Sequence, residues 1–289
     1  MILVTGATGT VGREVVRLLP ADLEVRVMAR DPARVLGAAA PAEIVAGDYR
    51  DPQSLARALR GVKAALLVTT DVMGDDDARF LRAACAAGVR HVVKLSAAAV
   101  ADSAADDLVT RWQRANEELL CGSGIEWTLL RPRSFMSNTL SWAARIRSER
   151  VVRALYGTSA NACVDPRDVA EVAVRALTED GHVGRIHTLT GPKAYTAVEQ
   201  TAELSRLLGH SLRFEELEPG RARAVLAQRH TTPVVEALLE SAERQRQGAK
   251  AGVNSTVLDV TGCPARSFRR WAEDHIAAFG GAREGGGRG

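Results

Sequence analysis

The chain has 289 residues, enough for one large α/β domain or two domains of ordinary size. Hydrophobic residues make up 46% of it, which excludes a wholly disordered chain, and the net charge of +3 is too small to favour a nucleic-acid partner. No apolar stretch reaches the ~20 residues that span a bilayer, and the four cysteines lack metal-type spacing. We therefore expect a cytoplasmic protein with no membrane contact and no metal site, present as a monomer or homodimer.

From the first residue to about residue 133, short apolar runs alternate with stretches of helical periodicity. The pair Asp51-Pro52 marks one helix start, because a capping side chain is followed by proline at the first helical position. This alternation predicts a Rossmann-type α/β fold, a doubly wound parallel sheet with helices on both faces. The strands expected in this half are residues 2–4, 25–28, 43–45, 64–68, 91–95 and 126–130.

After residue 133 the pattern becomes mainly helical. Thr196 and Glu199 form a capping box, which marks the start of one of these helices. The helices expected in this half are residues 137–150, 167–177, 196–209, 221–230, 234–247 and 267–279.

The two halves predict a nucleotide-binding core and a smaller lobe. Residues 1–133 are expected to form the core, and strands near 152–164 and 185–190 are expected to return to its sheet. The rest of 134–279 is expected to form a mainly helical substrate lobe. The glycine-rich end, 280–289, cannot bury enough apolar surface to order and is expected to be a disordered tail.

The segment TGATGTVG, residues 5–12, connects the first expected strand to the first helix. Gly6 permits a sharp turn, Gly9 lets a pyrophosphate approach the backbone, and Gly12 lets the helix pack closely on the sheet. Free N–H groups and the helix dipole favour an anion at this helix start. The setting predicts a dinucleotide-binding turn, although a purely structural turn could have the same spacing.

The end of the second strand distinguishes NAD from NADP in Rossmann domains. An acidic residue there binds the ribose hydroxyls, whereas an arginine suits the 2′-phosphate. Arg30 occupies this place in VRVMARDPAR and predicts NADP(H) as the cofactor. Asp48, which follows the third strand, either accepts a hydrogen bond from the adenine amino group or caps a local turn.

Seven segments carry a resemblance to a known family. In their order along the chain they resemble the NmrA-like branch of the atypical short-chain dehydrogenases/reductases, and the match covers most of residues 1–279. That branch includes NADPH-dependent quinone and dye reductases, ketone reductases, and redox sensors that bind NADP without known turnover. The segments are TGATGTVG, AGDYRDPQSLARALRGV, HVVKLSA, SGIEWTLLRPRSFMSN, VDPRDVAEVAVRAL, TLTGPKAYTAVEQTAELSRLLG and FRRWAEDHIAAF.

The resemblance implies a set of cofactor-binding residues, with the helical lobe closing over the nicotinamide end. By position these are Gly6, Thr8, Gly9, Thr10, Val11 and Gly12 at the pyrophosphate, Arg30 at the 2′-phosphate, Asp48 at the adenine, Thr69 and Thr70 along the ribose, and Ser96, Pro132 and Phe135 at the nicotinamide.

The proton relay of most short-chain dehydrogenases is missing from the sequence. That relay is a tyrosine four residues before a lysine, which lowers the tyrosine pKa for proton transfer. None of the three tyrosines is followed by lysine at this spacing. Counted back from Leu130-Arg131-Pro132, the two positions fall near Val109 and Gln113, and neither side chain can act as an acid.

Several residues are candidates to replace this pair or to line a substrate pocket. Ser96 is the candidate catalytic donor, unless it only bonds the loop backbone. For Lys94 three environments are possible from the sequence, namely a place near the cofactor, a solvated strand end, or an ion pair. The pocket candidates are Trp112, Ser134, Phe135, Asn138, Trp142 and Tyr156, although Trp and Phe at such spacings are more often core residues.

The absence of the tyrosine–lysine pair limits the classes of substrate that we expect the protein to reduce. A quinone, or a ketone with its own internal hydrogen bond, needs no protein acid because water can protonate the reduced oxygen. We therefore expect an NADPH-dependent reductase of a quinone or an aromatic, polyketide-like ketone, acting by direct hydride transfer. The alternative is a redox-sensing regulatory protein that binds NADP(H) without turnover.

Overall fold

The computed structural model describes residues 1–35 and 42–281, so most of the expected tail at 280–289 lies outside the described residues. The chain forms two units. Unit 1 comprises Met1–Pro132, Pro166–Leu189 and Thr256–Cys263. Unit 2 comprises Arg133–Asp165, Thr190–Ser255 and the chain from Pro264 on. Within the described ranges, no helix is long and apolar enough to cross a membrane.

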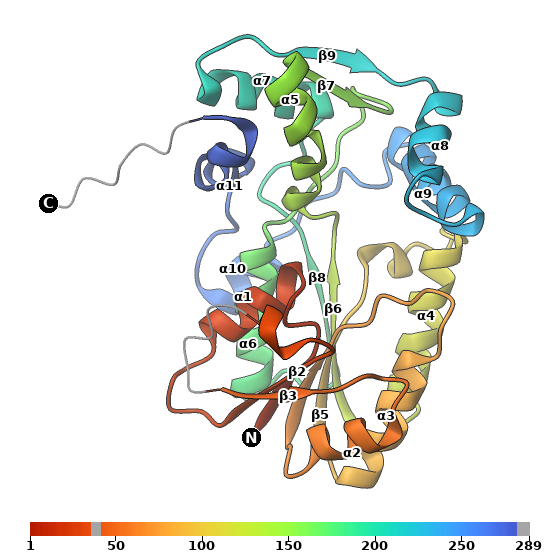
Figure 1. The fold of residues 1–289 in the computed structure, drawn as a ribbon, viewed down its shortest axis with the longest axis vertical. Helices are drawn as coiled ribbons and strands as arrows, with labels where there is room; N and C mark the ends of the chain where they lie inside the picture. Colours follow the sequence, from red (N-terminus) through yellow and green to blue (C-terminus); the bar gives the residue numbers. More distant parts are fainter. Residues whose placement is uncertain (36–41, 282–289) are drawn as a thin grey trace, which may run out of the picture. The chain divides into compact units, whose positions relative to one another are not determined.

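Unit 1 is built on a seven-stranded sheet in which every pair of neighbours is parallel (Figure 1). The strand order β3-β2-β1-β4-β5-β6-β8 confirms the predicted doubly wound sheet. The order changes direction between β1 and β4, which is the switch point where such sheets bind ligands. The strands are β1 (Ile2–Val4), β2 (Val25–Ala29), β3 (Glu43–Ala46), β4 (Ala64–Leu67), β5 (His91–Leu95), β6 (Glu126–Pro132) and β8 (Arg185–Leu189).

Helices cover both faces of this sheet, which explains why its central strands are apolar throughout rather than alternating. One face carries α2 (Pro52–Leu59), α3 (Asp76–Ala87) and α4 (Leu108–Cys121). The other carries α1 (Thr10–Leu18), α6 (Pro166–Thr178) and the short α10 (Thr256–Thr261). The expected Asp51-Pro52 start of α2 is confirmed, because the Asp51 carboxylate accepts a hydrogen bond from Gln53 N.

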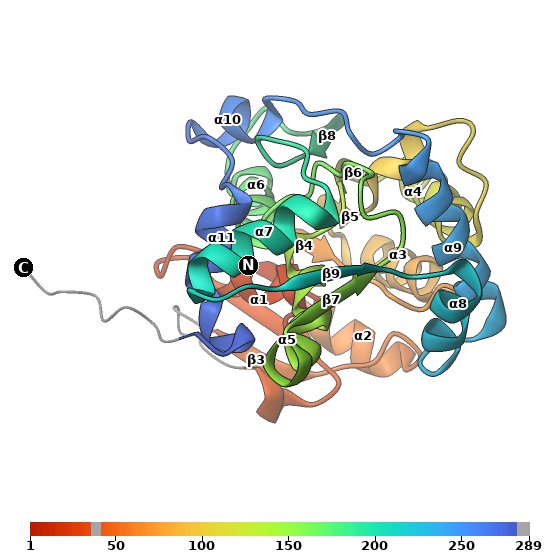
Figure 2. The same ribbon diagram turned by 90° about the horizontal axis from the view of Figure 1, so that it is seen from above.

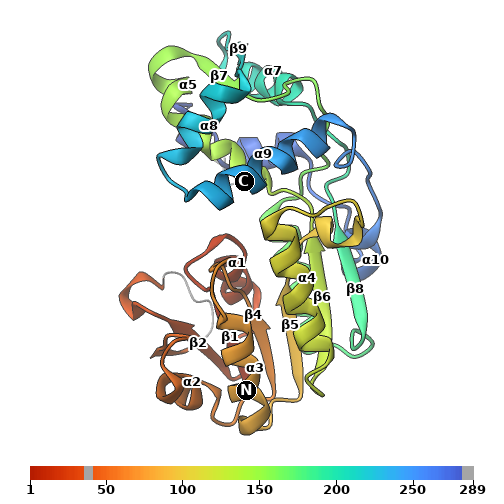
Figure 3. The ribbon, with the colours of Figure 1, turned by 90° about the vertical axis from the view of Figure 1, so that its right-hand side faces the viewer.

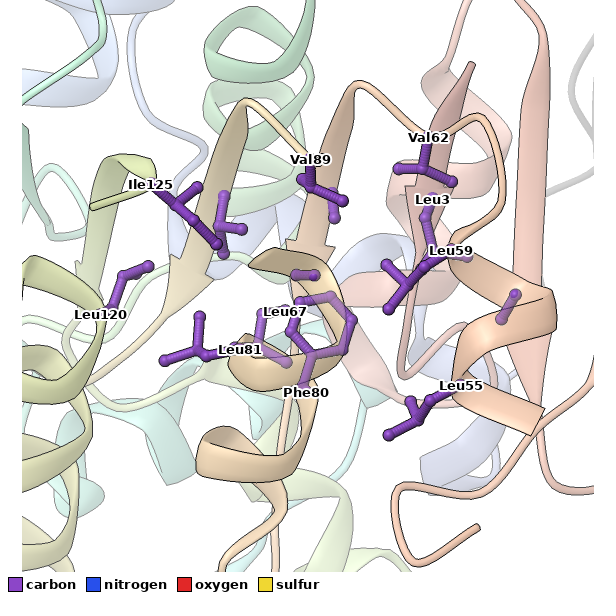
Figure 4. Packing of buried hydrophobic residues seen from close by; sticks show 14 of the residues in the cluster. Leu3, Leu55, Leu59, Val62, Leu67, Phe80, Leu81, Val89, Leu120 and Ile125 are labelled. Carbon is purple, nitrogen blue, oxygen red and sulfur yellow. The ribbon is translucent and has the colours of Figure 1, made fainter. Parts of the chain in front are cut away.

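The core on the α2–α3–α4 face joins the helices to the strands. Figure 4 shows Phe80 and Leu81 of α3 beside Leu67 of β4, with Leu55 and Leu59 on α2. Phe80 and Leu67 are completely buried, and burial of one such side chain is worth about 1.5–3 kcal/mol. These contacts hold α2 and α3 against the strands of unit 1.

The strand expected near 152–164 does not return to the large sheet. Instead β7 (Val151–Ala154) pairs in parallel with β9 (Arg213–Glu216) in a separate two-stranded sheet of unit 2. The free edge of β6 is occupied by β8, the strand expected near 185–190, so no edge of that strand remains for β7. The sequence RFEE of β9 is too polar to have indicated a strand.

Unit 2 is otherwise helical. The helix expected over 167–177 does not belong to it, because α6 packs against α1 and the sheet of unit 1. Its apolar core holds the completely buried Phe268 and Trp271, whose rings stack with centroids 5.7 Å apart. The capping box of Thr196 and Glu199 is confirmed at the start of α7. Figure 2 shows β7 and β9 side by side, with α5 and α7 next to them. The helices are α5 (Ala143–Glu149), α7 (Ala197–Leu208), α8 (Pro219–Ala227), α9 (Thr232–Arg246) and α11 (Phe268–Asp274).

Two histidines meet at the amino end of β8, away from the carboxyl ends of the strands. His182 Nδ1 lies 3.2 Å from His187 Nε2. Partial burial, together with the smaller effects of the neighbouring His182 and Arg185, lowers the pKa of His187 to about 4. The folded protein therefore resists protonation of this imidazole at mildly acidic pH.

We expect His187 to make the protein less stable as the pH falls from 6.5 towards 4. Its pKa is about 4 when folded and about 6.5 when unfolded, so over this range the unfolded chain binds the proton more readily. In urea denaturation at a series of pH values, the free energy of unfolding should fall less steeply with decreasing pH for His187→Gln than for the wild type. The exposed His230→Gln variant is the control, and identical pH profiles for wild type and His187→Gln would contradict the expectation.

Candidate functional site

The turn between β1 and α1 requires glycine at two of its three predicted positions. Gly6 has a φ of +65°, and a Cβ there would lie 2.8 Å from Cβ of Val68. A Cβ on Gly12 would lie 2.4 Å from the carbonyl oxygen of Gly6. Both contacts are closer than real Cβ atoms allow, so the tight turn and the close approach of α1 depend on these glycines.

The start of α1 offers backbone N–H groups to an anion. The helix begins at Thr10 after Gly9, and within the described residues no side chain caps it. Its first turn also lacks an acidic residue. Uncapped N–H groups and the positive end of the helix dipole form a site for a phosphate group.

A pocket of about 450 Å³ lies beside this turn, at the switch point of the sheet. Six of the predicted cofactor residues line it, whereas Thr10, Val11 and Gly12 lie just behind, in the first turn of α1. The lining residues are Gly6, Ala7, Thr8, Gly9, Met28, Ala29, Arg30, Gly47, Asp48, Tyr49, Arg50, Val68, Thr70, Asp71 and Asp76.

Arg30 is the free cation of this pocket within the described part of the chain. Its side chain is exposed and makes no ion pair there, whereas Arg50 is held by Asp71 at 2.7 Å. Asp48 caps a local turn by accepting a hydrogen bond from Arg50 N at 2.9 Å, and it also lines the pocket. Both interpretations of Asp48 therefore remain compatible with its position.

The sequence prediction missed the acidic side of the pocket. Asp71 and Asp76 follow the end of β4, where a search of residues beyond each strand end would have found them. Partial burial raises the pKa of Asp76, and the carboxylates of Asp71 and Asp48 raise it further. Tyr49 was also missed. It donates a hydrogen bond to the carbonyl of Val68 at 2.9 Å, and burial raises its pKa, so it stays neutral.

The two threonines after β4 have different surroundings. Thr70 lines the pocket, as predicted for a ribose neighbour. Thr69 is buried and donates a hydrogen bond of 2.6 Å to Asp77 of α3. The same carboxylate pairs with Lys94, which is completely buried and 5.8 Å from the ring centroid of Trp112. Of the options for Lys94, the ion pair is thus confirmed, and the solvated strand end is wrong because α3 supplies a carboxylate inside the fold.

A second buried network lies at the carboxyl ends of β5 and β6. Ser96 donates a hydrogen bond to Glu117 of α4, and Arg131 holds both oxygens of that carboxylate. The single hydroxyl hydrogen of Ser96 is therefore directed at Glu117 rather than at the loop backbone. In this arrangement Ser96 presents lone pairs, not a proton, to a ligand. Pro132 ends β6 next to Arg131.

The remaining predicted residues belong to unit 2. Ser134 accepts a hydrogen bond from Asn161 at 3.0 Å. Trp142 packs partly buried against the apolar core, and the ring of Tyr156 lies 5.8 Å from the guanidinium carbon of Arg246. Phe135 forms an isolated bridge with Val164, and Asn138 is exposed. Their roles in a substrate pocket stay predictions.

Comparison with known proteins identifies the family. Residues 6–180 match the sequence profile of a family described as NAD(P)H-binding. The fold matches the crystal structure of an NADPH-dependent quinone oxidoreductase from Escherichia coli in complex with NADPH, with a TM-score of 0.82 and 27% identity over 96% of this chain and 100% of that one. The chain belongs to the NmrA-like branch of the atypical short-chain dehydrogenases/reductases.

Two relatives in this branch are similar over nearly their whole length. A (4-alkanoyl-5-oxo-2,5-dihydrofuran-3-yl)methyl phosphate reductase of Streptomyces griseus is 57% identical over 96% of this chain and 99% of its own. An NAD(P)H azoreductase of Xenophilus azovorans is 37% identical over 98% of this chain and 100% of its own. This NmrA-like protein is therefore an NAD(P)H-dependent reductase, and its cofactor is NADP(H). The glycine turn, the uncapped α1 and the free Arg30 fit that dinucleotide.

Proposed function

We propose that this chain reduces the carbon–carbon double bond of a (4-alkanoyl-5-oxo-2,5-dihydrofuran-3-yl)methyl phosphate with NADPH. The observation that supports this most strongly is the 57% identity to a reductase named for that substrate, over nearly the full length of both chains. A quinone is the second candidate, supported by the 31% identity to a quinone oxidoreductase of Escherichia coli over 78% of this chain.

The chemistry of the substrate is compatible with a site that lacks an acid. Its double bond is conjugated to two carbonyl groups, the alkanoyl ketone and the lactone. Bound NADPH supplies a hydride, which would add to the ring carbon that bears the phosphomethyl group. The electron pair of the double bond then forms an enolate shared by both carbonyl oxygens, and water can protonate it afterwards. A tyrosine–lysine pair is not needed to complete this reduction.

Residues of unit 1 would bind the cofactor and border the reacting groups. The turn at Gly6 to Gly12 would hold the pyrophosphate, and Arg30 would pair with the 2′-phosphate. Ser96 accepts rather than donates, because Glu117 takes its hydrogen. It would therefore orient a ligand N–H instead of protonating the substrate.

The test follows the position of a label. NADPH carrying deuterium at the transferred position is mixed with the purified protein and the butenolide phosphate, and the product is examined by NMR. We expect deuterium on the ring carbon that bears the phosphomethyl group. Deuterium on the carbinol carbon of a reduced side chain would show ketone reduction instead. NADPH oxidation with a quinone such as menadione, but not with the butenolide phosphate, would favour the second candidate.

A further inference from the structure

Two side-chain amides on α4 each have one buried polar atom without a hydrogen-bond partner, within the part of the chain that the structure describes. Gln113 is 8% exposed and Asn116 is 6% exposed. Gln113 Oε1 and Asn116 Nδ2 are both buried and unsatisfied there. Buried polar groups of folded proteins are almost always hydrogen-bonded, so two neighbouring exceptions suggest that a polar ligand completes them.

The topology places Gln113 at the ligand-binding edge of the sheet, and Asn116 directly precedes Glu117 on the same helix. The helix α4 connects the parallel strands β5 and β6, so it runs back against their direction, and its amino-terminal half lies near their carboxyl ends (Figure 3). Glu117 confirms this register, because it bonds Ser96 after β5 and Arg131 on β6. Gln113 lies one helical turn, about 5.4 Å, beyond Glu117 on the same face.

The neighbouring polar groups are already satisfied by one another. Both oxygens of Glu117 are bonded to Arg131, and one of them also accepts from Ser96. The Thr110 hydroxyl, one turn before Gln113 on α4, donates to Asp107 at 2.7 Å. Within the described residues, Gln113 Oε1 and Asn116 Nδ2 thus remain without a partner.

An amide suits a particular kind of ligand. It is neutral at every physiological pH, so it cannot transfer a proton, but its N–H groups can stabilise an oxygen that gains negative charge. Rotation of either amide about its last bond exchanges oxygen and nitrogen, so both side chains can present N–H groups. Two adjacent donors match a ligand with two carbonyl groups on one ring carbon. Their oxygens share the negative charge of the enolate that forms when hydride adds to the neighbouring carbon of the double bond.

We infer that Gln113 and Asn116 form a carbonyl-binding subsite that stabilises the enolate formed during reduction of a 1,3-dicarbonyl acceptor, an assignment that rests on the proposed function. Counted back from Leu130-Arg131-Pro132, Gln113 falls near the position of the lysine in the family's usual relay. The subsite replaces proton transfer by hydrogen bonding to the developing charge. Gln113 and Asn116 would therefore contact the substrate in a site that lacks the tyrosine–lysine pair.

The test uses α-acetyl-γ-butyrolactone, a saturated 1,3-dicarbonyl that can ionise to an enolate but has no ring double bond to reduce. Its binding to the NADP⁺-loaded protein is followed by the ultraviolet absorption of the enolate. The variants Gln113→Met and Asn116→Leu should each weaken enolate binding roughly tenfold, the loss of one hydrogen bond to a charged group. The exposed Glu118→Gln variant on the same helix is the control and should bind the probe like the wild type.

Two further measurements separate a binding role from a structural one. The affinity for NADPH, from fluorescence titration, should stay within about threefold of the wild type, and the melting temperature should be unchanged or raised. A rise is expected because an apolar side chain removes a buried unsatisfied group. A clearly lowered melting temperature, or unchanged probe binding in both variants, would overturn the subsite.

The outcome is independent of the proposed substrate. If the wild type leaves the butenolide phosphate unreduced but binds the enolate in a manner that depends on Gln113 and Asn116, the proposed function fails and the subsite stands. If the wild type reduces that substrate and both variants reduce it with unchanged kcat/KM and bind the probe normally, the function stands and the subsite fails.

Discussion

Lys94→Met is expected to lower the free energy of unfolding by about 3–5 kcal/mol, the loss typical of removing one partner from a buried ion pair. Lys94 is completely buried, and Asp77, its partner, is 1% exposed. Methionine fills a similar volume, so the main effect is a buried carboxylate without its cation. Among the described residues, the hydrogen bond from Thr69 would then remain to this carboxylate. Denaturation of wild type and variant in urea measures the difference.

The double variant Lys94→Met/Asp77→Leu distinguishes charge from packing. Because it removes both charges, it should recover at least half of the lost stability. The control is Lys63→Met on the exposed surface, for which we expect a change below about 0.5 kcal/mol. A Lys94→Met variant as stable as this control would show that the pair does not contribute to the fold.

Arg30→Asp should weaken NADPH binding about 100-fold while it changes NADH binding less than threefold. A charge-assisted bond from arginine to phosphate is worth about 1.5–3 kcal/mol, and the introduced carboxylate would also repel the 2′-phosphate. It can accept hydrogen bonds from the ribose hydroxyls of NADH instead. The dissociation constants of both cofactors, from the change in nicotinamide fluorescence, give the preference directly.

The choice of control matters because the substitution reverses a charge. Arg229→Asp makes the same change at an exposed position of unit 2 and should leave the ratio of NADPH to NADH affinity unaltered. Equal weakening of both cofactors by Arg30→Asp would mean that Arg30 does not read the 2′-phosphate. Arg50, which lines the same pocket but is paired with Asp71, would then be the next cation to replace.

The nucleotide-binding end of unit 1 was largely predictable from sequence. A strand, a glycine turn and a helix occupy fewer than 20 consecutive residues, and their geometry follows from local sterics. Arg30 could be placed because it directly follows a buried strand. Among the residues that were missed, Arg50 and Asp71 come from loops and Asp76 is the first residue of α3, and the positions of these segments depend on contacts with other elements.

The centre of the site was less predictable. Ser96 was expected to donate to a substrate or to its own loop, but Glu117, 21 residues later, accepts its hydrogen. Lys94 was expected in one of three environments, and only the position of α3 decided for the ion pair. In both networks the partner comes from a different element, so no local pattern could reveal it.

Sequence patterns were sufficient to predict the alternating strands and helices of unit 1, its parallel sheet and the cofactor, because each follows from periodicity, sterics or charge within a short segment. The sequence also established that the tyrosine–lysine pair is absent. The pairing of β7 with β9 is seen only in the folded chain, because the two strands are far apart in the sequence. The packing of α4 on β5 and β6 likewise decided that Ser96 is an acceptor and that Gln113 and Asn116 are left unpaired within the described residues. Such pairings depend on which edges and side chains remain free after the chain has packed, and that is a property of the whole fold.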